Sequence, residues 1–199
     1  MSYKSLTSSH LGQGVTYHKP DHARYENLTL ENPALDVMTD LKKVTAFTIH
    51  PGEKIDTADK KMKDKAVRML FVVDAHDDIQ GVITSGDILG EKPMKYIQQN
   101  GGTHAEIEVS DIMCPASRIE TLTIKEVSHA KVGDIIETLK HLGRQHALVV
   151  DNQGSGNKMT LRGIFSLSNI ARQLGVKIQN HEVASTLADI AHVINQSHS

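Results

Sequence analysis

Hydrophobic positions follow the same order twice along the chain, beginning near residue 33. A short apolar run at 69–73 ends in Asp74, and a matching run at 147–150 ends in Asp151. Both runs are short and rich in valine and leucine, which predicts buried strands rather than helices. A segment with apolar residues at helical spacing precedes each run, most clearly at 132–142. Each half is therefore predicted to place a helix directly before a buried strand.

A second strand and a further helix are expected after each buried strand. Gly81 and Gly163 each precede two apolar residues, in strands predicted at 79–83 and 161–165. Both strands run into a hydroxyl residue and then into the start of a helix. An Asp-Val-Met triplet at 36–38 is also repeated, as Asp-Ile-Met at 111–113. The order strand, helix, strand, strand, helix, written twice, indicates a duplicated α/β unit.

The duplication divides the chain into five expected segments. These are an N-terminal extension at 1–32, a first repeat at 33–92, a linker at 93–106, a second repeat at 107–175, and a C-terminal amphipathic helix with its tail at 176–199. The last segment carries Val183, Leu187, Ile190 and Ile194 on one helical face. That face is expected to pack on the body of the protein or on a partner subunit.

Composition and charge narrow the class of protein. The 199 residues are 39% hydrophobic, which is enough to build a core. A net charge of −2 argues against a protein that wraps duplex nucleic acid. The single cysteine, Cys114, fits a reducing compartment, and no apolar run is long enough to span a membrane. We expect a soluble, cytoplasmic protein that binds neither nucleic acid nor membrane.

The sequence offers no motif for catalysis and only a weak one for metal binding. It lacks the Gly-x-Ser-x-Gly and His-Glu-x-x-His patterns, and its glycine-rich segment at 154–158 lacks the spacing of a phosphate loop. His18 and His22 stand four residues apart, but no third ligand is near them in sequence. We therefore expect a protein that is not an enzyme and that has neither catalytic residues nor a metal cofactor.

The repeated pattern resembles a tandem pair of cystathionine-β-synthase (CBS) domains, also called a Bateman module. The resemblance rests on the two triplets, on Val-Val-Asp at 72–74, on Gly-Val-Ile-Thr-Ser-Gly-Asp at 81–87, and on their second-copy counterparts. It covers about residues 33–175. It implies an α/β fold in which two β-α-β-β-α repeats pack in a pseudo-two-fold arrangement. It also implies a regulatory module that binds an adenine nucleotide between the repeats and forms a homodimer.

Thr84 and Asp87 are the leading candidates for contacts to such a nucleotide. They stand at a predicted strand-to-helix turn, where unpaired amides and the helix dipole favour a phosphate. The resemblance implies that Thr84 donates a hydroxyl and that Asp87 accepts both ribose hydroxyls. The same residues also fit a capping box, in which they serve only the helix. The sequence leaves both interpretations open.

The second copy departs from this pattern. Ser166 keeps the hydroxyl, but Asn169 stands where the acid is expected. A neutral amide oxygen is a weaker acceptor than a carboxylate. The second site is therefore expected to be weaker, differently selective or empty.

Three residues are candidate cations for a phosphate. Arg68, Arg144 and His146 stand at the starts of the two buried strands, and the guanidinium groups suit a phosphate better than a partly charged histidine. The alternative is that all three are solvated ends of amphipathic segments. From the resemblance alone, the adenine is expected near Phe47 or Ile124 in the opening strand of a repeat.

The sequence thus favours a sensor that binds AMP, ADP or ATP and signals to an unidentified protein partner. The main alternative is an interaction or dimerisation module without a ligand, in which Thr84 and Asp87 only cap a helix. The acid at Asp87 favours the first hypothesis, and its absence at Asn169 favours the second. Metal sensing through His18 and His22 is a third hypothesis.

Overall fold

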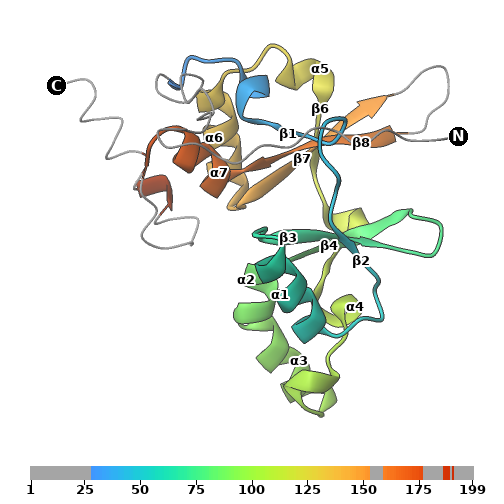
Figure 1. Cartoon of the computed structure of the whole chain (residues 1–199). Helices are drawn as coiled ribbons and strands as arrows, with labels where there is room; N and C mark the ends of the chain where they lie inside the picture. The colour runs from blue at the N-terminus through green and yellow to red at the C-terminus, as the bar shows by residue number, and fades with distance from the viewer. Residues whose placement is uncertain (1–27, 153–158, 177–185, 189, 191–199) are drawn as a thin grey trace, which may run out of the picture.

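The computed structural model describes residues 28–152, 159–176, 186–188 and 190. Two four-stranded sheets face each other across the middle of the molecule, and the helices cover their outer sides (Figure 1). The α/β class and the duplicated arrangement predicted from the sequence are confirmed. The turn at 153–158, the pair His18 and His22, and most of the predicted C-terminal helix lie outside the described residues.

The first repeat follows the predicted order of elements. They are β2 (Thr48–Ile49), α1 (Ile55–Asp64), β3 (Met69–Val73), β4 (Ile79–Thr84) and α2 (Ser85–Leu89). Strand β2 runs parallel to β3, and β4 runs antiparallel to it. The tight turn between β3 and β4 is held by Asp74, whose carboxylate accepts from the amides of His76 and Asp78. This local carboxylate contact is typical of a turn.

The second repeat has the same order with one added helical turn. Its elements are β6 (Thr121–Thr123), α5 (Ile124–Val127), α6 (Val132–Leu142), β7 (His146–Asn152), β8 (Met159–Ser166) and α7 (Leu167–Gln173). Strand β6 runs parallel to β7, and β8 runs antiparallel to it. Helix α6 ends at Gly143 with φ 61°, a left-handed conformation that glycine adopts readily at a helix C-terminus.

Each sheet takes its fourth strand from the other half of the chain. Strand β1 (Thr39–Asp40) pairs with β8, and β5 (Cys114–Pro115) pairs with β4. Asp40 also forms an ion pair with Arg162 of β8, which lowers the pKa of its carboxyl group. Each packed unit therefore contains a segment that the boundaries at 33–92 and 107–175 assign to the other repeat.

The repeated triplets are exchanged together with these strands. Val37 lies in η2 (Ala34–Val37) and is buried in the core of the second unit. Ile112 lies in α4 (Val109–Ile112) and is buried in the core of the first unit. The duplication is therefore interlocked rather than a string of two separate domains.

Strand β3 is buried on both of its faces. Leu70 and Val72 pack with α1 in the core of the first unit. Met69, Phe71 and Val73 point the other way, into an apolar cluster between the two sheets. A strand covered on both sides has no exposed face and needs apolar residues throughout, which explains the unbroken run at 69–73.

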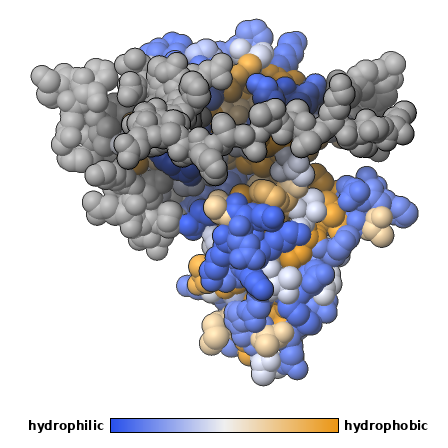
Figure 2. Space-filling view, viewed as in Figure 1, coloured by the Kyte–Doolittle hydropathy of each residue, from blue (hydrophilic) through white to orange (hydrophobic). Residues whose placement is uncertain are grey.

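The segments outside the two repeats contact both cores. Helix α3 (Lys92–Asn100) occupies much of the predicted linker, and its Tyr96 and Ile97 pack against the first core. It is followed by η3 (His104–Glu106), and η4 (Ala116–Arg118) comes after β5. Leu28 and Leu30, at the end of the predicted extension, pack against the second core, where Ile190 is also buried. In the view of Figure 2, the described surface of the first unit is mostly hydrophilic.

Candidate functional site

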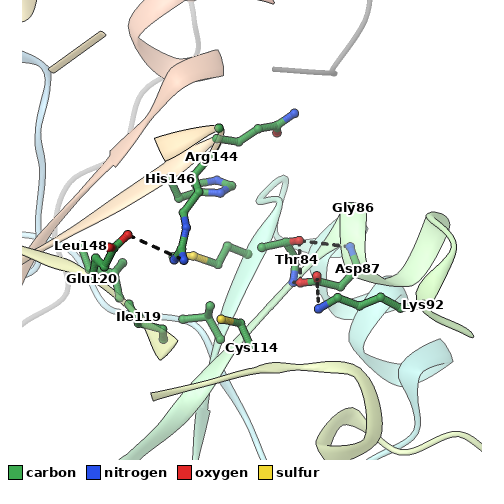
Figure 3. A pocket seen from close by; sticks show the side chains of 14 residues that line it. Thr84, Gly86, Asp87, Lys92, Cys114, Ile119, Glu120, Arg144, His146 and Leu148 are labelled. Carbon is green, nitrogen blue, oxygen red and sulfur yellow. Dashed lines mark hydrogen bonds and ion pairs between the residues drawn. The ribbon is translucent and has the colours of Figure 1, made fainter. Parts of the chain in front are cut away.

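The described residues enclose two cavities between the repeats. The first cavity has a volume of about 390 Å³ and is lined by Thr84, Gly86 and Asp87 from the first repeat. Arg144 and His146 line it from the second repeat. Figure 3 shows Thr84 and Asp87 on one side of this cavity and the two second-repeat residues on the other. The volume lies within the usual range of small-molecule sites, roughly 300–1,000 Å³.

The second cavity is larger, with a volume of about 780 Å³. Ser166 and Asn169 line it from the second repeat, and Arg68 lines it from the first. The sequence-predicted residues are therefore brought together in two groups, each of which draws on both repeats. The exception is Phe47, which lines neither cavity.

The two cavities occupy equivalent places in the duplicated fold. In the first sheet Met69 is paired with Thr84, and in the second sheet His146 is paired with Ser166. Met69 and His146 are therefore equivalent residues, and each of them lines both cavities. They form a common wall between the two sites.

Thr84 and Asp87 form a complete capping box at the start of α2. The amide and the hydroxyl of Thr84 donate to Asp87 Oδ2 at 2.8 and 2.7 Å, and the Asp87 amide donates to Thr84 Oγ1 at 3.2 Å. The capping interpretation is therefore confirmed. Helix α2 has only five residues and its cap already takes the Asp87 amide, so the helix terminus alone makes a poor phosphate site.

Lys92 is a residue of this site that sequence reasoning missed. Its Nζ lies 2.7 Å from Asp87 Oδ1 and donates to the carbonyl of Ile112 at 2.8 Å. A carboxylate oxygen accepts about two hydrogen bonds. Both acceptor positions of Oδ2 are taken by Thr84, so with Lys92 in place Asp87 can accept one further hydroxyl through Oδ1, whereas the resemblance implies two. Lys92 was missed because a linker was expected from 93 onward, whereas helix α3 begins at Lys92.

The charges of the first cavity are balanced. On the side opposite Asp87, the Arg144 guanidinium donates to the carbonyl of Arg118 at 3.2 Å and lies 3.9 Å from the carboxylate of Glu120 (Figure 3). Two acidic and two basic side chains therefore line the cavity, and each base has an acid beside it.

The described lining of the second cavity carries positive charge and no acidic side chain. Arg68 and Arg172 line it, and its described lining contains no aspartate or glutamate. Nε of Arg68 is buried and has no hydrogen-bond partner among the described residues. Burial also lowers the pKa of Arg68, because a charged group is less stable away from water. The hydroxyls of Ser166 and Ser168 lie 3.0 Å apart at this cavity.

His146 does not supply the positive charge expected of it. Burial lowers the pKa of His146 to about 4, and the nearby charge of Arg68 lowers it as well, whereas Asp87 acts in the opposite direction. The imidazole is therefore neutral near pH 7. As a neutral ring it forms part of the wall between the two cavities rather than a cation for phosphate.

The expected position of an adenine beside Phe47 or Ile124 stays a prediction, and neither residue lines the two cavities. The ring of Phe47 packs against the first core, with Lys65 Nζ 5.7 Å from its centroid. Its carbonyl accepts from the Phe71 amide at 3.0 Å. Ile124, the other residue considered, packs against the second core. Both belong to structural contacts rather than to a cavity.

Two absences concern the described part of the chain only. None of the helices found there is long and apolar enough to cross a membrane. The same residues contain no cluster of three or more histidine, cysteine, aspartate or glutamate side chains arranged to hold a metal.

Comparison with known proteins identifies the architecture. Residues 34–93 match the family model of the CBS domain. An uncharacterized 17.7 kDa protein of Acidianus ambivalens is 25% identical over 129 residues, which cover 64% of this chain and 66% of that protein, just under two thirds of its length.

Solved structures extend the likeness to both repeats. A CBS-domain protein of Agrobacterium tumefaciens superposes with a TM-score of 0.53 and 18% identity, covering 74% of this chain and 98% of its own. The Arabidopsis thaliana protein CBSX2, in complex with AMP, gives a TM-score of 0.48 and 22% identity over 71% of this chain and 94% of its own. The chain therefore contains a CBS domain at 34–93, and the same element order in its second half gives it the fold of a tandem pair of CBS domains.

Proposed function

We propose that this chain is a regulatory module that binds an adenine nucleotide (AMP, ADP or ATP) between its CBS repeats and signals to a protein partner. The observation that carries the proposal is that each cavity is lined by both repeats. A ligand in such a cavity touches both repeats at once. It therefore favours the relative placement of the repeats that it fits best, and this is how binding reaches a partner.

The first cavity offers the groups that a nucleoside monophosphate needs. Asp87 Oδ1 is a charged acceptor for a ribose hydroxyl, and the guanidinium of Arg144 is a donor suited to phosphate. Val82, Ile119 and Leu148 supply apolar surface for a base. The position of Gly86 in the lining leaves room for close approach to the backbone.

The decisive variant is Asp87→Asn, tested by thermal unfolding with AMP, ADP and ATP. A nucleotide at about 100 times its dissociation constant stabilises the folded chain by about 2.7 kcal/mol, which raises the midpoint by several degrees. We expect the wild-type chain to show this rise with at least one nucleotide. The variant is expected to lose most of the rise, because it lacks the charged acceptor.

The chain contains a matched control for the cap that Asp87 also forms. Thr123 and Glu126 make the same capping box at the start of α5, and neither residue lines a cavity. Glu126→Gln therefore changes a capping carboxylate to an amide away from the ligand. We expect it to lower stability slightly and to keep the full nucleotide response. Equal responses in wild type, Asp87→Asn and Glu126→Gln would contradict the assignment of Asp87.

The absence of any nucleotide effect would favour the other hypothesis, a ligand-free interaction module. Two observations favour that hypothesis, namely the complete Thr84–Asp87 cap and the pairing of Asp87 with Lys92 without a ligand. The homodimer and the cytoplasmic location predicted from the sequence belong to the proposal as well. Light scattering of the purified chain measures the first of these.

A further inference from the structure

We propose that the ion pair of Lys92 with Asp87 is a latch that connects the first cavity to helix α3. Lys92 holds one carboxylate oxygen of Asp87, and a ligand with two neighbouring hydroxyls displaces it and releases the start of α3. This inference rests on the proposed function, because it concerns how binding beside Asp87 reaches the rest of the chain. It names the element that responds to the ligand and the ligand feature that causes the response.

Lys92 joins three elements through its ammonium group. Nζ lies 2.7 Å from Oδ1 of Asp87 in α2 and donates to the carbonyl of Ile112, the last residue of α4, at 2.8 Å (Figure 3). The Asp87 side chain is only 16% exposed, so the pair is better shielded from water than an exposed ion pair. Tyr96 and Ile97 pack the later part of α3 on the first core. The contact of Lys92 therefore concerns the first turn of α3.

The two oxygens of Asp87 have separate partners. Oδ2 accepts from the amide and the hydroxyl of Thr84, and Oδ1 accepts from Lys92. A carboxylate oxygen accepts about two hydrogen bonds, so Oδ1 has one position left. One ligand hydroxyl can share Oδ1 with the ammonium group, whereas two neighbouring hydroxyls need both positions. A ribose with both hydroxyls therefore competes with Lys92, and a deoxyribose does not.

The fold itself does not require this ion pair, because the second repeat lacks it. Counted from the hydroxyl residues that end β4 and β8, Asn169 stands in place of Asp87. Leu174 stands in place of Lys92 and packs against the second core. The corresponding segment of the second repeat thus folds without a charged pair, which favours a regulatory role for the pair in the first.

The first test needs no nucleotide and measures hydrogen exchange, by mass spectrometry, in peptides that cover residues 89–97. We expect Lys92→Met to speed exchange there about fivefold, because the charged contacts are lost while the apolar stem is kept. Asp87→Asn is expected to act in the same way, since its one amide oxygen can serve Thr84 or Lys92 but not both. The double variant is expected to exchange no faster than either single variant. Additive effects would overturn the latch.

Lys95→Met is the matched control within the same helix. Nζ of Lys95 lies 2.6 Å from a carboxylate oxygen of Glu91, and Lys95 does not line the first cavity. Its effect on exchange is expected to add to that of Asp87→Asn. If Lys95→Met is coupled to Asp87→Asn as strongly as Lys92→Met is, the variants only loosen α3 in general and the latch is wrong. A thermal melt verifies that each variant is folded.

The second test compares AMP with 2′-deoxy-AMP, or the corresponding di- or triphosphates where these bind more tightly. Calorimetric titration is expected to show that Lys92→Met raises the preference for the ribonucleotide about fivefold, because its second hydroxyl no longer displaces an ammonium group. Any contact of Lys92 with the phosphate is common to both ligands and cancels in this ratio. In wild type, only the ribonucleotide is expected to speed exchange at 89–97. An unchanged preference, or the same exchange with both ligands, would overturn the latch.

The latch and the proposed function can fail separately. If a nucleotide binds beside Asp87 but Lys92→Met leaves the preference unchanged, the proposed function stands and the latch fails. If no nucleotide binds, the proposed function fails. The exchange of the single and double variants then still decides whether Lys92 couples Asp87 to α3.

Discussion

The two cavities arise from equivalent positions of a duplicated fold, yet they differ in charge. At the first, Asp87 is both a helix cap and the partner of Lys92, and Arg144 faces Glu120. At the second, the described lining places only neutral side chains beside Arg68 and Arg172. The common fold decides where a ligand touches both repeats. The side chains at a few positions then decide which ligand chemistry each place accepts.

The two exchanged strands, β1 and β5, also differ in how tightly the chain around them packs against a glycine of the receiving sheet. Gly81 and Gly163 occupy equivalent positions, in contact with β5 and with the residue before β1 respectively. A Cβ atom at Gly81 would lie 2.4 Å from the backbone carbonyl oxygen of Cys114. A Cβ atom at Gly163 would lie 2.5 Å from Sδ of Met38, which belongs to a flexible side chain.

The largest expected effect is therefore that of Gly81→Ala. Because a backbone carbonyl cannot move without disturbing the β4–β5 pairing, we expect it to lower the free energy of unfolding by about 3 kcal/mol. Gly163→Ala is expected to cost about 1 kcal/mol, since the Met38 side chain can change rotamer. Urea denaturation of both variants measures the difference. Equal losses of unfolding free energy would show that the contacts at Gly81 and at Gly163 accommodate an added methyl group equally well.

The second prediction concerns the wall that Met69 and His146 form between the cavities. His146 can bind a proton, whereas its equivalent Met69 cannot. An ordinary histidine pKa is near 6.5, whereas that of folded His146 is about 4. Between these values the unfolded chain binds a proton that the folded chain does not. The free energy of unfolding therefore falls as the pH falls, by at most about 2 kcal/mol between pH 7 and 5.

His146→Met makes the two sides of the wall alike and is expected to remove this loss. Urea denaturation of wild type and variant at pH 7 and pH 5 measures it. The pKa values of carboxyl groups such as Asp40 and Asp74 are lowered in the folded chain. These groups therefore change the free energy of unfolding at pH values below this range. The same loss of stability in wild type and variant would show that another group is responsible.

The sequence predicted the repeated order of elements because each element has its own periodicity. The apolar run at 69–73 and the helical stripe at 132–142 are local signals, and the structure confirms both. The strand exchange has no such signal. Strands β1 and β5 are two residues long, and β1 pairs with residues more than 120 positions away. Such pairing depends on the packing of whole repeats.

The candidate site was predictable in its residues but not in their contacts. Thr84 and Asp87 do line a cavity, and the capping box that the sequence left open is formed. The partner of Asp87, Lys92, was not predicted, because nothing local shows that α3 turns back towards α2. The neutral state of His146 was missed for the same reason, since it results from burial between repeats and from the charge of Arg68.

The smallest expected effect comes from making the second cavity resemble the first. Asn169→Asp places an acid three residues after Ser166, and Ser166 at present makes no side-chain cap. The new carboxylate can accept from the Ser166 amide and face the two arginines, so we expect stability to rise by about 0.5–1 kcal/mol.

The same change gives the second cavity the charged acceptor that Asp87 supplies to the first, so the gain in stability is expected to come from the new cap and from the two arginines together. Urea denaturation of wild type and variant measures the gain. Asn169→Ala is the control, because it removes the amide without adding charge. If the stability is unchanged in Asn169→Asp, the acid does not form the cap that Asp87 forms in the first repeat, and the difference between the two cavities is not set at this position alone.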